Sequence, residues 1–193
     1  MAATPSAMLP LGTQAPDFTL PGVDGKTVSR KQYDGKPLLV AFICNHCPFV
    51  KHIIDAFVEK ATEYRKKGVG VVAINANDVD GYPEDDPEHM RGFASEHGFT
   101  FPYLFDEDQS VARAYQAACT PDFFLFDKDH KLFYRGQFDA ARPGNDEGVT
   151  GADLTAAVNA LVAGKPAPTP QKPSVGCNIK WKPGNEPAFA GIT

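Results

Sequence analysis

The order of apolar and polar positions along the chain predicts a strand, a helix and a second strand in its first half. Residues 37–43 form an uninterrupted apolar run whose length and composition are typical of a buried strand. From Val50 to Ala61, apolar residues recur at helical spacing with charged residues between them, which predicts an amphipathic helix. A second run at residues 68–74, rich in β-branched residues, predicts another core strand. Together these elements predict a β-α-β crossover.

The same pattern predicts regular structure over most of the remaining chain. Two short strands, 18–20 and 27–29, flank a Gly-containing turn and predict an N-terminal hairpin. A β-α-β unit followed by an antiparallel hairpin and a final helix predicts an α/β protein with a thioredoxin-like fold and this hairpin as an extension. The other expected elements are helices at 86–97, 110–117 and 152–163, and strands at 101–105, 123–126 and 131–135.

The C-terminal segment departs from this pattern. Residues 164–193 contain six prolines, which exclude helix or strand over most of the segment. Trp181, the only tryptophan, lies among other apolar residues that are unusual in a free coil. We therefore predict a thioredoxin-like domain at residues 1–163 and an extended, irregular, Pro-rich tail at 164–193 that packs on the domain, with Trp181 as its anchor.

Composition narrows the functional classes. A chain of 193 residues that is 42% hydrophobic can bury the core of one α/β domain. The net charge of −5 gives no support for nucleic acid binding, and no apolar stretch is long enough for a membrane span. The first 16 residues do not resemble a secretory signal, so we expect a cytoplasmic protein. Four cysteines in a reducing compartment indicate catalysis or metal binding rather than structural disulfides.

The clearest chemistry lies in the C-x-x-C sequence Cys44-Asn45-His46-Cys47, at the point where the first strand becomes a helix. Pro48 suits the first helical turn, so both thiols lie near a helix N-terminus, where a thiolate is favoured. We expect Cys44, as the more exposed thiol, to have a lowered pKa and to attack a disulfide, and Cys47 to resolve the mixed disulfide. His46 is expected to stabilise the thiolate; the alternative is a solvated loop residue.

Several segments resemble the peroxiredoxin-like (alkyl hydroperoxide reductase/thiol-specific antioxidant) subgroup of the thioredoxin-like superfamily. The opening at residues 11–20 resembles the family as a whole, and residues 44–52 and 176–182 are more specific to the subgroup. Thr120-Pro121, before a predicted core strand, resembles the cis-proline site of thioredoxin-like proteins. The resemblance implies that Pro121 holds the Thr120 backbone near the dithiol, for strand-like pairing with a substrate.

Departures from the peroxiredoxin pattern bear on the activity. With Cys47 as the peroxidatic thiol, Cys44 would replace the usual Thr, Val40 would replace the usual Pro, and the expected Arg position falls near Pro121. Without these donors a fast peroxide reaction is not supported. The prediction is a thiol–disulfide oxidoreductase without a cofactor and with at most weak peroxide reductase (antioxidant) activity. Its expected partner is a thioredoxin-type reductant or a disulfide-bearing protein substrate.

Two further thiols leave alternatives open. Cys119 lies two residues before Pro121 and is expected near the dithiol, as an inert buried thiol or as a third sulfur ligand. In the second case the protein is a Zn- or Cu-binding protein that uses Cys44, Cys47 and Cys119, with His46 or His52 nearby. Cys177 is a resolving or shuttling thiol if the tail folds over the site, and a half-buried tail residue otherwise.

The acidic segment at residues 75–86 does not have the ligand spacing of an EF-hand loop. We expect a solvated crossover loop that ends in a helix cap. It follows the strand beside the dithiol strand, so Asn75 and Asn77 are expected to line the mouth of the site.

Overall fold

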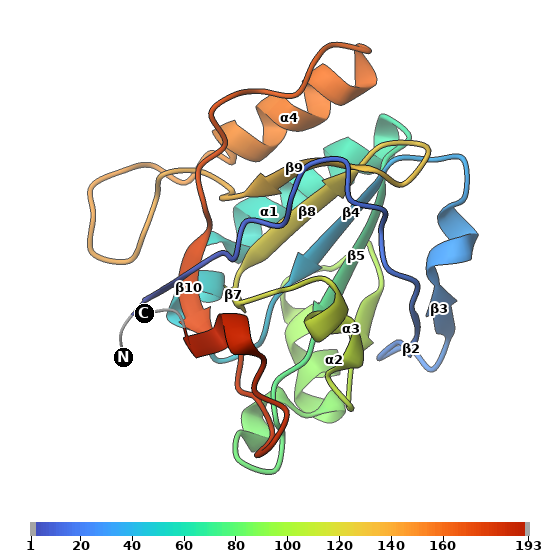
Figure 1. The fold of residues 1–193 in the computed structure, drawn as a ribbon. Helices are drawn as coiled ribbons and strands as arrows, with labels where there is room; N and C mark the ends of the chain where they lie inside the picture. The colour runs from blue at the N-terminus through green and yellow to red at the C-terminus, as the bar shows by residue number, and fades with distance from the viewer. Residues whose placement is uncertain (1–2, 192–193) are drawn as a thin grey trace.

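The computed structural model describes residues 3–191, built around a five-stranded sheet (Figure 1). Strands β4, β5 and β6 are parallel, β8 pairs antiparallel with β4, and β9 pairs antiparallel with β8, in the order β6-β5-β4-β8-β9. This arrangement confirms the predicted thioredoxin-like α/β fold. The strands are β4 (Leu38–Phe42), β5 (Gly70–Asn75), β6 (Tyr103–Phe105), β8 (Asp122–Phe126) and β9 (Leu132–Gly136).

Helices cover both faces of this sheet because its central strands are apolar on both sides. Along β4, Leu39 and Ala41 face one buried cluster, whereas Leu38, Val40 and Phe42 face another. Helices α1, α2 and α4 contribute side chains to the first cluster, and α3 and the N-terminal hairpin contribute to the second. The helices are α1 (Pro48–Lys66), α2 (Pro87–Glu96), α3 (Ser110–Ala114) and α4 (Ala152–Val162).

The predicted N-terminal hairpin is confirmed. Strands β2 (Thr19–Pro21) and β3 (Thr27–Ser29) pair antiparallel. Short 3-10 helices complete the regular elements: η1 (Arg30–Tyr33), η2 (Pro83–Asp85) and η3 (Ala188–Gly191). Within residues 3–191, every helix is too short or too polar to cross a bilayer.

A second, three-stranded sheet joins both ends of the chain to the core. Its order is β1 (Thr4–Pro5), β10 (Val175–Asn178) and β7 (Cys119–Thr120), with both pairings antiparallel. Figure 1 shows β10 running beside β7, with the N-terminal segment along its other side. The sequence pattern gave no sign of a strand in the tail, because a run of four residues between prolines and glycines has no periodic signal of its own.

The rest of the tail also contacts the core. Ile179 is buried, and Trp181 packs against the core cluster on the α3 side of the sheet and meets Phe189 edge-on at 6.3 Å between ring centroids. The division into a domain at residues 1–163 and a tail at 164–193 stays a prediction.

Candidate active site

The C-x-x-C sequence connects β4 to α1. Cys47 is the N-cap residue of α1 and Pro48 its first residue, whereas Cys44 lies in the preceding loop. Both residues are buried, with exposed fractions of 1% for Cys44 and 0% for Cys47. Neither thiol is open to solvent, so Cys44 is not the exposed nucleophile that was expected. Thr120 of the cis-proline loop contacts both sulfurs, and Cys177 of the tail interacts with Cys47.

Both thiols contact Thr120, and each shifts the pKa of the other. The Thr120 hydroxyl lies 3.5 Å from the Cys44 sulfur, and the Cys47 thiol donates to the Thr120 carbonyl at 3.2 Å. The Thr120–Pro121 bond is cis, as predicted. The structure therefore brings Cys44, Cys47 and Thr120 together beside Pro121; their catalytic roles stay predictions.

The charge of the reduced pair resides on Cys47. Hydrogen bonds from Cys44, Cys177 and Thr120, together with one from the Val50 N–H, outweigh burial and lower the pKa of Cys47 to about 5. The hydrogen bond to Cys47, burial and the charge of Asp85 raise the pKa of Cys44 well above its usual value. The predicted low pKa of Cys44 is wrong, because the Cys44 thiol interacts with Cys47, is buried and lies near the negative charge of Asp85.

His46 is held by a buried carboxylate. Its Nδ1 lies 2.5 Å from Asp85 Oδ2 and 4.0 Å from the Cys44 sulfur. The hydrogen bond to Asp85 raises the pKa of His46, although burial opposes the shift. The ring stacks on Tyr82 at 5.5 Å between centroids. The solvated-loop alternative for His46 is thus wrong, and a role in thiolate tuning stays a prediction.

Asp85 is the site residue that the sequence analysis missed. It lies in η2, is fully buried, and accepts hydrogen bonds from the backbone N–H groups of Asn45 (2.8 Å) and His46 (3.3 Å) and from Asn77 Nδ2 (2.8 Å). Burial alone would raise the pKa of Asp85, but its hydrogen bonds lower that pKa below the usual value.

The expectation of a solvated loop is therefore wrong at Asp85, Asn75 and Asn77, all of which are buried. Asn75 donates to the Asp85 carbonyl at 2.8 Å and accepts from the Asn77 N–H at 3.0 Å, so both asparagines hold the loop rather than line an open mouth. One feature of the sequence could have indicated that this loop lies at the site. Its two asparagines follow a strand adjacent to the dithiol strand, and parallel strands end at the same edge of the sheet.

The tail folds over this site. The sequence analysis expected Cys177 to be a resolving or shuttling thiol in this case. Cys177 is 5% exposed and packs in the same buried cluster as Cys44 and Cys47. Burial and the adjacent Cys47 raise the pKa of Cys177 to about 12. Further along the tail, Lys180 lies over the ring of Tyr82 at 5.6 Å from its centroid.

The predicted metal set is not assembled. Cys119 is buried, but its thiol approaches the Pro121 carbonyl at 3.6 Å rather than the dithiol, and His52 is exposed. Among residues 3–191, the cluster of metal-ligand type is instead Cys44, His46 and Asp85, whose ligand atoms lie within 4.8 Å of one another.

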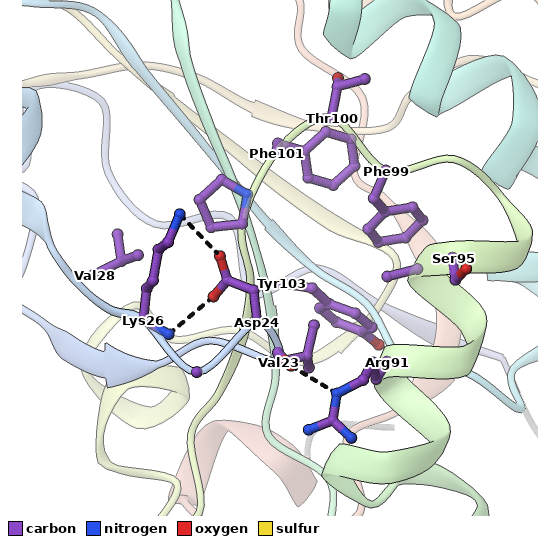
Figure 2. Close-up of a pocket in the computed structure, with 13 residues that line it drawn as sticks. Val23, Asp24, Lys26, Val28, Arg91, Ser95, Phe99, Thr100, Phe101 and Tyr103 are labelled. Carbon is purple, nitrogen blue, oxygen red and sulfur yellow. Dashed lines mark hydrogen bonds and ion pairs between the residues drawn. The ribbon is translucent and has the colours of Figure 1, made fainter.

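Two surface pockets lie near the site. A pocket of about 790 Å³ is lined by Asn45 and His46 and by the charged face of α2. A second, of about 900 Å³, lies between the Val23–Lys26 turn and the segment that leads into β6. Figure 2 shows the Asp24–Lys26 ion pair on one side of this second pocket and the rings of Phe99 and Phe101 on the other. Tyr103 connects it to the site, since its hydroxyl donates to Asn45 Oδ1 at 2.7 Å.

Comparison with known proteins gives relatives along nearly the whole chain. A crystal structure of an uncharacterized conserved protein from Geobacillus kaustophilus is 54% identical, with a TM-score of 0.93, and the match covers 95% of this chain and 98% of that one. The thiol-disulfide oxidoreductase ResA of Bacillus thuringiensis (strain Al Hakam) is 27% identical over 122 residues, which are 63% of this chain and 66% of that protein. ResA of Geobacillus thermodenitrificans is 30% identical over 129 residues, 67% of this chain and 70% of that protein.

The family assignment rests on most of the chain. Residues 11–135 match the AhpC/TSA family, and this range contains β4, the dithiol, α1 and the cis-proline. The chain belongs to the AhpC/TSA family of thioredoxin-fold proteins.

Proposed function

We propose that this protein is a thiol–disulfide oxidoreductase in which Cys44 and Cys47 cycle between dithiol and disulfide. The observation that carries the proposal is the pair of hydrogen-bonded thiols at the start of α1, opposite Thr120 and the cis Pro121. The names of the ResA relatives support the same chemistry.

The reduced pair supplies two electrons to a substrate disulfide. The Cys47 thiolate attacks one substrate sulfur, so that a mixed disulfide forms and the other substrate sulfur leaves as a thiolate. Cys44 then attacks the Cys47 sulfur, which releases the second substrate thiolate and leaves a Cys44–Cys47 disulfide. The lowered pKa of Cys47 supports this order, which reverses the one expected from the sequence. A thioredoxin-type reductant in the cytoplasm would restore the dithiol, and a disulfide-bearing protein is the substrate class.

Peroxide reduction belongs to this proposal only as a slow side activity. Arg142, the arginine that follows the sheet, donates to the carbonyl oxygens of Asp139 and Ala141 and to the Gln137 side chain. A guanidinium engaged in this way does not polarise a peroxide at the dithiol. Consumption of H2O2 with a thiol reductant measures this activity, and a peroxidase-like rate would contradict the assignment.

The test of the main proposal is a redox titration in glutathione buffers, with alkylation and peptide mapping of each cysteine. We expect a reversible Cys44–Cys47 couple between about −270 and −120 mV, the range of known dithiol oxidoreductases. C44S and C47S should each abolish it, and C119S should leave it intact. Absence of a reversible couple in the wild type would refute the proposal.

The alternative of a Zn- or Cu-binding protein is not favoured by these relatives. Metal analysis of the purified wild type and of C44S tests it independently. A stoichiometric metal in the wild type that is lost in C44S would restore the metal-binding alternative.

A further inference from the structure

The strand position beside the cis-proline loop is occupied by the chain itself. Strand β10 pairs antiparallel with β7, and this register sets Cys177 opposite Thr120 and Asn178 opposite Cys119. In the proposed function, the Thr120 backbone is where a substrate strand would pair. The tail therefore presents a cysteine to the dithiol in the place that a disulfide substrate would take.

Gly176 makes this close approach possible. A Cβ atom at residue 176 would lie 2.0 Å from the Thr120 carbonyl oxygen and 3.2 Å from the Pro121 nitrogen. The backbone of β10 thus lies directly against the cis-proline loop, closer than any side chain permits. Such a fit is specific to this register, because a shift by one residue would place the Cys177 or Val175 side chain against the same carbonyl.

Cys47 can form a disulfide with either of two neighbouring thiols, Cys44 or Cys177. Its sulfur lies in one buried cluster with Cys44 and Cys177, close enough for both to lower its pKa. Cys177 packs in the same buried cluster as the dithiol, whereas Cys119 hydrogen-bonds to the Pro121 carbonyl. Of the two cysteines outside the C-x-x-C sequence, Cys177 is therefore the one in contact with the dithiol.

We propose that β10 is a tethered substrate strand, in which Cys177 exchanges disulfides with Cys47 and must be displaced before an external disulfide protein can reach the site. This inference rests on the proposed thiol–disulfide activity and assigns Cys177 as a third redox residue.

The exchange is an isomerisation that needs no further oxidant. When the dithiol has reduced a substrate and become the Cys44–Cys47 disulfide, the Cys177 sulfur attacks the Cys47 sulfur. The Cys44–Cys47 bond breaks as the Cys47–Cys177 bond forms, and the proton lost by Cys177 is taken up by Cys44. One thiol and one disulfide are present before and after the step. The raised pKa of Cys44 supports it as the thiol that keeps the proton.

The sequence makes the two disulfides easy to distinguish by mass spectrometry. Trypsin does not cleave before proline, so Cys44 and Cys47 fall in the peptide 32–51, Cys119 in 114–128 and Cys177 in 136–180. A Cys44–Cys47 disulfide stays within one peptide. A Cys47–Cys177 disulfide links 32–51 to 136–180.

The experiment oxidises the full-length chain with oxidised glutathione and maps its disulfides under acid quench. In C44S, where the first disulfide cannot form, we expect glutathione at Cys47 to be displaced by Cys177, giving the 32–51/136–180 link. In C44S/C177S and C44S/C177A, the glutathione adduct should persist at least about 10-fold longer, because an intramolecular thiol has a high effective concentration. C44S/C119S is the matched control and should behave as C44S.

The outcomes separate this inference from the proposed function. A reversible Cys44–Cys47 couple in the wild type, with a persistent glutathione adduct and an alkylatable Cys177 in C44S, would overturn the inference alone. No Cys44–Cys47 couple in the wild type, with a Cys47–Cys177 disulfide in C44S, would refute the proposed dithiol activity and support Cys177 as a redox thiol. Both disulfides together would support the whole proposal.

Discussion

At the scale of single residues, the surroundings of each thiol favour the negative charge on Cys47 rather than on Cys44. The interaction with Cys44 is the main cause of the lowered pKa of Cys47. The same interaction, burial and the carboxylate of Asp85 raise the pKa of Cys44. The two cysteines are three residues apart in the sequence, yet the surrounding charges shift their pKa values in opposite directions.

Thiolate formation should therefore follow Cys47. Absorbance at 240 nm of the reduced protein is expected to rise with a midpoint near pH 5, the pKa of Cys47. C47S should abolish this transition, and C44A should raise its midpoint, because alanine has no donor to replace the Cys44 thiol beside the thiolate. An unchanged transition in C47S would contradict the assignment.

The lowered pKa of Cys47 also links stability to pH. The thiolate stabilises the reduced folded state above the unfolded pKa of about 8.5, and this contribution is lost as the pH falls through about 5. The free energy of unfolding of the reduced form, relative to the oxidised form, should rise between these pH values, which urea titrations of both forms would measure. A difference that does not change with pH would contradict the prediction.

The carboxylate of Asp85 should control His46. D85N is expected to lower the pKa of His46 toward about 6.5 and to reduce the free energy of unfolding by roughly 2–3 kcal/mol, since a buried charged hydrogen-bond network is broken. In the wild type the ion pair contributes fully below about pH 6.5, and the contribution is lost as the pH rises through the raised pKa of His46.

The measurements for this variant are a proton NMR titration of the His46 ring and a urea titration. D86N is the matched control, because Asp86 is next in the chain but pairs with the exposed His89, at 2.9 Å. It should shift only the pKa of His89. An equal shift of the His46 pKa in both variants would disprove the specific role of Asp85.

At the scale of elements, long periodic segments were predictable and short ones were not. The apolar run of β4 and the helical spacing of α1 determine their structure locally, because each buries a continuous apolar face. Strands β7 and β10, of two and four residues, form through pairing with distant segments: β10 pairs with β7 on one side and with β1 on the other. Likewise, η2 is held in position by hydrogen bonds to Asp85 from residues far away in the sequence, such as the N–H of Asn45.

Strand β10 should depend on the absence of a side chain at residue 176. G176A places a methyl group against the Thr120 carbonyl, so we expect a free energy of unfolding lower by about 1–3 kcal/mol and faster alkylation of Cys47. G148A is the control, since no atom lies within 4 Å of a Cβ there. Equal alkylation rates in both variants would show that β10 does not restrict access.

At the scale of the whole molecule, both ends of the chain are fastened to the sheet beside the site. The Ser6 hydroxyl donates to Asp122 Oδ1 at 2.7 Å, the Ser6 N–H donates to the Ser174 carbonyl at 2.9 Å, and the Ser174 N–H donates to the Ser6 hydroxyl at 3.0 Å. All three residues are buried. The N-terminal segment, the tail and β8 thus share one hydrogen-bond network.

Asp122 should make the stability of this assembly depend on pH. Burial raises the pKa of Asp122 from 3.8 to about 7, although the Ser6 hydroxyl opposes the shift. The folded state therefore binds more protons than the unfolded state, and stability falls as the pH rises from about 4 to about 7. D122N should remove this fall in urea titrations. D146N, which removes a charge from an exposed loop, should retain it; a parallel loss in both variants would contradict the assignment.

The sequence by itself determined the thioredoxin-like core, the hairpin, the C-x-x-C sequence at the start of α1 and the proline loop opposite. Each of these features is specified by residues close together in the sequence, through apolar periodicity, a proline that starts a helix, and family motifs. Only the tertiary structure decided which thiol is the thiolate, that Asp85 holds His46, and that Cys177 meets Cys47. Hydrogen bonds and charges act over a few ångströms in space, so residues distant in the chain affect one another only after the fold has brought them together.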